Sequence, residues 1–178
     1  MTTKIGTLNL VEDRPLVQWL WRGVMALAAL ALLIMYVDVF DVYEISIVIF
    51  TAVTMALLGQ NWAGFRHHSI TVTILSLLAI QLYGTDLSLA DSDFLLSYIL
   101  ASQSAFMWMS ALFVLATVTY FTGLIFRSDF TLQVGTGLTW SAVTMGMVGL
   151  MVRWKESYLI GVDVGHIPVS NLYEVFIL

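Results

Sequence analysis

The sequence predicts an all-α integral membrane protein, because both its composition and the spacing of its charges suit lipid better than water. Hydrophobic residues make up 60% and charged residues only 11% of the 178 residues, whereas soluble domains carry roughly 25% charged residues. Several nearly uncharged runs reach the length of about 20 residues at which a helix crosses the apolar core of a bilayer. The whole chain is therefore predicted to form a single transmembrane region, residues 1–178.

The composition also excludes several classes of function. The chain contains no cysteine, which rules out disulfides, thiolate metal sites and thiol catalysis. It has no run rich in Lys and Arg, so binding to nucleic acid has no electrostatic basis. No paired carboxylates, Gly-rich phosphate loop or nucleophile with its base appears in the sequence. We therefore predict neither an enzyme nor a metal site.

The positions of the apolar runs predict about five transmembrane spans. Acidic residues and Arg14 precede the first run, and no small-residue cleavage site follows it, so we interpret it as a retained span and not as a signal peptide. The loop after the second run holds Arg66, His67 and His68. The predicted spans are residues 16–37, 42–62, 69–83, 105–126 and 132–152.

The apolar run 94–126 needs a division, because as one helix it would reach roughly 50 Å. We place the division near Ser102-Gln103-Ser104. The part before it is predicted to be a short interfacial helix, which begins after the potential N-caps Asp91 and Asp93. Its large apolar and aromatic residues are Phe94, Leu95, Tyr98 and Ile99. In the fifth span, Ala142 and Gly146 have the small-xxx-small spacing that lets helix backbones approach closely.

The last part of the sequence is polar and then apolar again. Residues 153–171 are predicted to form an outward-facing loop that contains Pro168. Residues 172–178 have the length of two helical turns, which is too short to cross a bilayer. We interpret them as the start of a sixth span, and we expect the sequence to be the N-terminal part of a longer protein.

The distribution of basic residues predicts the orientation of the chain in its membrane. One side would hold Lys4, Arg14, Arg22, Arg66 and Arg127, and the positive-inside rule places that side, with the N-terminus, in the cytoplasm. The outer side would hold only Arg153 and Lys155, with Glu156 near enough to pair with either. Two basic residues on the disfavoured side indicate either a specific use or ordinary interfacial anchoring beside Trp154.

Two clusters of polar residues at fixed spacing carry a resemblance to a known family. They fit the pattern R-W-x-E-S, then G-H-x-P-x-S-N-x-Y-E, and resemble the CcsA/ResC-type (CcsB) cytochrome c biogenesis proteins of System II. Residues 78–84 and 102–117 also look like that family. The matching residues of the two clusters are Arg153, Trp154, Glu156, Ser157, Gly165, His166, Pro168, Ser170, Asn171, Tyr173 and Glu174.

The resemblance implies a location in the bacterial cytoplasmic (inner) membrane and a role in delivering or presenting haem outside that membrane, for attachment to apocytochrome c. Besides the surrounding lipid, it implies two partners: a second membrane protein of cytochrome c biogenesis and apocytochrome c itself. The family's haem site uses a tryptophan-rich WWD motif and flanking histidines, and this sequence has no W-G-x-x-W-x-W-D pattern. The sequence therefore resembles only the N-terminal half of the family, and we expect haem to be a cofactor of the full-length protein that this part does not bind. The alternatives are a structural docking partner that binds no haem and a small transporter subunit. A transporter would carry ionisable residues inside its spans, and these spans contain almost none.

His166 has two interpretations. A neutral imidazole is a common axial ligand of haem iron, and the predicted topology places this residue outside, near the membrane surface. Alternatively, its ring hydrogen-bonds backbone in a turn between Gly165 and Pro168, ahead of the sixth helix.

Other polar residues have structural interpretations. Ser170 or Asn171 would cap the sixth helix, with Glu174 in its first turn. His67 and His68 are adjacent, and neighbouring residues do not share a helix face. We therefore interpret them as solvated loop residues and not as a joint metal site.

The predicted topology can be tested with reporter fusions. Alkaline phosphatase fused after Gly161 should be active, because that position is predicted to lie outside the cytoplasm. The same enzyme fused after His68 should be inactive. The reverse pattern of activities would overturn the orientation.

Overall fold

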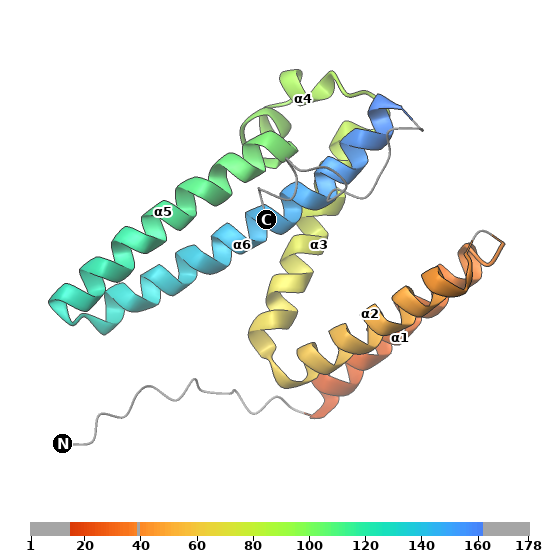
Figure 1. Cartoon of the computed structure of the whole chain (residues 1–178), viewed down its shortest axis with the longest axis horizontal. Helices are drawn as coiled ribbons and strands as arrows, with labels where there is room; N and C mark the ends of the chain where they lie inside the picture. The colour runs from red at the N-terminus through yellow and green to blue at the C-terminus, as the bar shows by residue number, and fades with distance from the viewer. Residues whose placement is uncertain (1–14, 39, 162–178) are drawn as a thin grey trace. The chain divides into compact units, whose positions relative to one another are not determined.

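The computed structural model describes residues 15–38 and 40–161, and the regular structure in these ranges is entirely helical (Figure 1). The chain divides into two compact units, of which the first ends at His67 and the second begins at His68. Four helices of the described residues are long and apolar enough to cross a membrane: α1 (Pro15–Met35), α2 (Val42–Asn61), α5 (Ser102–Phe126) and α6 (Asp129–Ile160). An all-helical protein with several membrane-type helices is thereby confirmed.

In the first unit, α1 and α2 pack together around one tryptophan. The Trp21 indole N–H donates to the backbone oxygen of Met55 over 2.9 Å. The indole fills the space over Gly59, where an added Cβ would lie 2.1 Å from Trp21 Nε1. Nearby, Arg22 Nε donates to Gln60 Oε1 at 2.9 Å. These polar contacts are effective in an apolar setting, because an unpaired polar group there is costly.

The start of α2 at Val42 agrees with the sequence prediction and has a clear local cause. Asp41 Oδ1 accepts from the backbone N–H groups of Tyr43 and Glu44, and Glu44 Oε2 accepts from the backbone N–H of Asp41. This capping box satisfies N–H groups that the helix itself leaves without partners.

The third helix is longer than predicted. α3 (Ala63–Tyr83) begins right after Trp62, so Arg66, His67 and His68 lie in a helix, and their prediction as a loop is wrong. Arg66 is buried and donates to the backbone oxygen of Gly59. This bond satisfies a carbonyl near the end of α2 that has no helical partner, which allows the two helices to meet across a single residue.

His68 is also not a solvated loop residue. It is half-buried in the second unit, with Nδ1 3.0 Å from Thr144 Oγ1 and its ring centroid 5.3 Å from that of Trp140. α3 is absent from the four membrane-type helices because its basic and hydroxyl residues dilute its apolar character.

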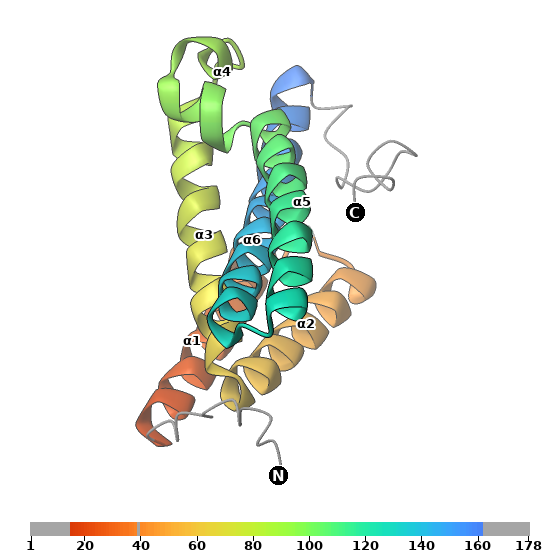
Figure 2. The ribbon, with the colours of Figure 1, turned by 90° about the vertical axis from the view of Figure 1, so that its left-hand side faces the viewer.

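The second unit is built on the antiparallel pair α5 and α6, which lie side by side in both views (Figures 1 and 2). Glycines of α6 lie against large side chains of α5. Gly135 faces Tyr120, Gly146 faces Met109, and Gly149 faces Phe106. Ala142 is fully buried on the same helix. The small-residue spacing predicted for this span thus lies in a close helix–helix contact, as expected inside a bilayer.

The run before α5 is divided at the predicted place, since α5 begins at Ser102. The short helix predicted before the division is present, because residues 94–100 are helical and end in the π-helix η1 (Leu96–Leu100). A separate turn, α4 (Leu89–Ser92), precedes it and was not predicted. The division frees backbone oxygens, and α5 side chains bind them. Ser104 Oγ donates to the Ser97 oxygen at 2.5 Å, and Trp108 Nε1 donates to the Tyr98 oxygen at 2.8 Å.

α6 continues past the predicted end of the fifth span at Val152. Residues 153–160, predicted as part of the loop 153–171, are its last two turns, so that part of the prediction is wrong. The polar residues there are good helix formers, and two of them, Glu156 and Ser157, are buried against the unit. A helix of 32 residues reaches roughly 48 Å, more than the ~30 Å apolar core of a bilayer. Residues 162–178, including the rest of that loop and the start of the sixth span, lie outside the described residues.

The close contact between α5 and α6 predicts a matched pair of substitutions. Gly149→Leu should destabilise the protein by about 1–3 kcal/mol, because its Cβ alone would lie 2.9 Å from the Phe106 ring. A Cβ added at Gly137, on the same helix, would meet no neighbouring atom within 4 Å, so Gly137→Leu should change stability by less than about 0.5 kcal/mol. Thermal unfolding in detergent would compare the two, and equal midpoints would contradict the packing.

Candidate functional site

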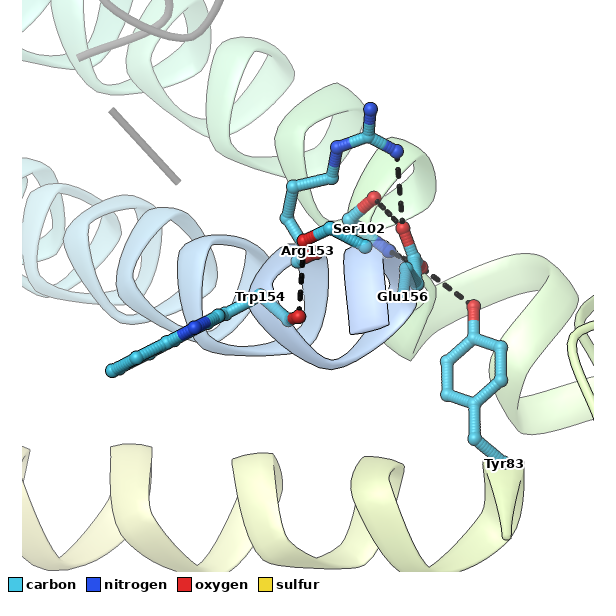
Figure 3. A network of polar contacts seen from close by, with 6 residues as sticks. Tyr83, Ser102, Arg153, Trp154 and Glu156 are labelled. Carbon is cyan, nitrogen blue, oxygen red and sulfur yellow. Dashed lines mark hydrogen bonds and ion pairs between the residues drawn. The ribbon is translucent and has the colours of Figure 1, made fainter. Parts of the chain in front are cut away.

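A buried carboxylate, that of Glu156, joins three helices at one end of the second unit (Figure 3). Tyr83 Oη donates to Glu156 Oε1 at 2.6 Å, and the backbone N–H of Ser102 donates to the same oxygen at 3.0 Å. Ser102 Oγ donates to Oε2 at 2.5 Å, and Arg153 Nη1 lies 3.6 Å from Oε2. We call these four residues the Glu156 network.

Each partner of the carboxylate stands at a helix end. Tyr83 is the last residue of α3, Ser102 is the first of α5, and Glu156 lies in the last turns of α6. The backbone N–H of Ser102 belongs to the first turn of α5, where helices lack internal acceptors. The N-terminal end of a helix also carries partial positive charge. Glu156 therefore caps α5 from another helix.

The face of α6 that carries Glu156 is apolar in the turns before that residue. Val148, Val152 and Glu156 are four residues apart, so they share one face, and the two valines are fully buried. They pack in a core cluster with Ala79 and Tyr83 of α3. This packing holds the carboxylate away from the surrounding solvent or lipid.

Removing a carboxylate from water is expensive, and it is tolerated only with good compensation. Glu156 receives three hydrogen bonds and one ion pair, which together satisfy both of its oxygens. The Arg153 side chain in that pair is 38% exposed, so the network reaches the surface on that side.

A pocket of about 320 Å³ opens beside the network. Its walls come from the end of α3, the α4–η1 region, the start of α5 and the end of α6. The residues with polar side chains that line it are Tyr83, Asp91, Ser97, Ser102, Gln103, Ser104, Arg153 and Glu156. One basic and two acidic side chains share this pocket, so it is suited to polar ligands.

The acidic residues before η1 act mainly as local caps. Asp93 Oδ1 accepts from the backbone N–H of Leu96 at 3.0 Å, which confirms the predicted capping role of Asp93. The Ser88 backbone N–H donates to Asp86 at 2.8 Å, and this bond lowers the pKa of the Asp86 carboxyl. These groups order the chain between α3 and α5.

The structure separates the residues that the sequence pattern singled out. Arg153 and Glu156 form the predicted ion pair. Lys155 does not join it among the described residues, because neighbouring helical residues point in different directions. Trp154 likewise points away from Glu156 (Figure 3). Ser157 Oγ donates to the Arg153 backbone oxygen at 2.8 Å, within α6.

Seven residues of the pattern lie outside the described residues, so the interpretations of His166 as a ligand or as a turn residue both stand. They are Gly165, His166, Pro168, Ser170, Asn171, Tyr173 and Glu174.

Sequence reasoning missed Tyr83 and Ser102 as members of the site. Each has a sequence feature that could have identified it. Tyr83 ends an apolar span, and Ser102 lies where a long apolar run must be divided. Their pairing with Glu156 joins positions 73 and 54 residues apart. No local pattern reports such a separation.

The pocket does not fit haem through its described residues. Haem iron takes axial ligands from His, Met, Cys or Tyr. Among the described residues that line the pocket there is no His, Met or Cys, and the Tyr83 hydroxyl is buried against Glu156. Within residues 15–38 and 40–161, no three His, Asp or Glu side chains gather to hold a metal ion.

The Glu156 network predicts coupled losses of stability. Tyr83→Phe and Ser102→Ala should each cost about 1–3 kcal/mol, because each removes a donor from a buried charge. Their effects should not add in the double variant, since both act on one carboxylate.

Ser110→Ala is the matched control for Ser102→Ala. It also lies in α5, is exposed, and donates only to the backbone oxygen of Phe106 in its own helix. Denaturation in mixed micelles would measure all four proteins. Strict additivity, or an equal loss in Ser110→Ala, would show that the network does not hold the three helices together.

Comparisons with known proteins do not assign this site. The chain matches no protein-family model, no curated protein and no solved structure at a significant level. The site must therefore be interpreted from its own residues.

Proposed function

We propose that this chain is a membrane component of cytochrome c biogenesis, and that it supports the presentation of haem outside the cytoplasmic membrane for attachment to apocytochrome c. The proposal rests on one observation. Three of the four segments that carry the family resemblance, residues 78–84, 102–117 and 153–158, contribute side chains to the Glu156 network, and the fourth, residues 165–174, lies outside the described residues.

The geometry gives the pattern R-W-x-E-S a physical meaning. Arg153 and Glu156 are three residues apart and form an ion pair on one face of α6. Glu156 then binds the end of α3 through Tyr83 and the start of α5 through Ser102. In this arrangement the pattern fixes the end of α6 in a defined position, from which the chain continues into the second cluster of the pattern.

The described residues would support the site and would not ligate haem. Arg153 places a positive charge on the wall of the polar pocket, and its direction is restrained by Glu156. A planar guanidinium suits carboxylates, such as those of an anionic cofactor or a partner protein, better than an ammonium does. Under this proposal the ends of α3 and α6 face outward, and the partners are a second biogenesis membrane protein and apocytochrome c.

A substitution in the chromosomal gene tests the proposal. Arg153→Ala should lower the amount of covalent haem on c-type cytochromes by about tenfold, the equivalent of roughly 1.4 kcal/mol of lost binding. Arg153→Lys should recover only part of it, because an ammonium cannot reproduce the planar fork. Haem-stained gels of membrane and extracytoplasmic fractions would measure maturation, and immunoblots would measure the level of this protein.

Arg127→Ala is the control, because Arg127 is exposed in the turn between α5 and α6. It removes the same charge at a distance from the network and should leave maturation normal. Normal maturation in both Arg153 variants would refute the proposal. Loss of the protein from the membrane in both would assign Arg153 to folding, as expected of a docking subunit without a role in haem handling.

A further inference from the structure

A second hollow lies on another face of α6, between that helix and α3. It is a groove of about 450 Å³. α6 contributes Met151, Trp154, Lys155 and Tyr158, whose spacing places them on one helix face. This face is separate from the one that carries Glu156, and Figure 3 shows Trp154 extending away from that carboxylate on the side of α3. The α3 wall is mainly apolar.

One group in the α3 wall lacks a partner. Ser76 lines the groove, is only 6% exposed, and its hydroxyl has no hydrogen-bond partner among the described residues. Other hydroxyls of this protein, such as those of Thr73 and Thr117, donate to the carbonyl four residues earlier in their helix. A buried hydroxyl without a partner calls for an explanation, and a bound molecule with an acceptor oxygen supplies one.

The rim of the groove has the residues that favour a lipid head group. Lys155 is the one charged residue among the described residues that line it. The residue is half-buried, and a lysine in such a position can bury its aliphatic stem while its ammonium reaches the membrane surface. Trp154 and Tyr158 are partly exposed beside it, and aromatic residues of these types gather at membrane interfaces.

We propose that this groove binds one anionic phospholipid of the surrounding bilayer. The acyl chains lie along apolar residues such as Val72, Leu77 and Met151, and the Lys155 ammonium pairs with the phosphate. The Ser76 hydroxyl, whose oxygen is covered in the structure, rotates toward the groove and donates to an ester carbonyl oxygen of the glycerol backbone. An apolar groove, one basic residue at its rim and one unpaired donor in its wall match the three parts of such a lipid. The site is independent of the function proposed above.

Native mass spectrometry of the purified full chain tests the proposal. The protein would be titrated with phosphatidylglycerol and with phosphatidylcholine of the same acyl chains. The wild type should prefer phosphatidylglycerol. Lys155→Gln should weaken phosphatidylglycerol binding by about fivefold, the effect of one basic residue near an anionic head group. It should weaken phosphatidylcholine binding less, because the choline cation of that lipid already offsets the charge of its phosphate.

Three further variants separate the effect of the Lys155 charge from that of the Ser76 hydroxyl and from that of removing a positive charge elsewhere. Lys155→Arg should keep the preference, and Ser76→Ala should weaken both lipids equally, because both carry ester carbonyls. Arg127→Gln removes one positive charge from the opposite end of α6 and should bind as the wild type does. Equal binding of the two lipids by the wild type, or an equal loss in Arg127→Gln, would overturn the proposal.

A photo-cross-linking experiment in membranes identifies the occupant without purification. A benzophenone amino acid would replace Leu77, which lines the groove and is 60% exposed. Cross-links to phospholipid, reduced when Lys155→Gln is combined with it, support the site. Cross-links confined to another protein, or to residues 162–178 of this chain, would show that a polypeptide and not a lipid fills the groove.

Discussion

The second unit depends on the compensation of a single buried charge. Glu156 can lie among apolar helices only because Tyr83, Ser102 and Arg153 satisfy its oxygens, and each of those partners stands at or near a helix end. Breaking a buried ion pair leaves an uncompensated charge, which costs roughly 3–5 kcal/mol. The ends of α3, α5 and α6 are therefore tied to one another. A displacement of one helix end would expose the Glu156 carboxylate or leave one of its hydrogen-bond donors without an acceptor.

Close packing supplies the second constraint. Lipid is as apolar as the helix surfaces, so burial of apolar area does little to hold membrane helices together. α5 and α6 instead approach through glycines that receive Phe106, Met109 and Tyr120. α1 and α2 also pack through a glycine, because Gly59 lies against the Trp21 indole. In both units a polar contact complements this packing, which fixes the register as well as the distance.

The two faces of α6 near its C-terminal end have different chemistry. One face carries Glu156 and joins a polar pocket, whereas the other carries Trp154 and Lys155 beside an apolar groove. The helix is longer than the apolar core of a bilayer, so it can cross that core and still extend its last turns into the interface. There a charged side chain can reach water or lipid head groups within its own length.

The sequence alone determined the class of this protein, the start of α2 and the division before α5, because hydropathy, capping residues and helix length are local properties. It could not determine that residues 153–160 continue α6, that Arg66 and His68 lie in α3, or that Lys155 faces away from Glu156. The polar character of those segments suggested loops, and only tertiary contacts satisfy their side chains within helices. Two of the partners of Glu156, Ser102 and Tyr83, lie 54 and 73 residues away along the chain. Such a separation leaves no periodic signal, so the tertiary structure alone decided where the charge would be buried.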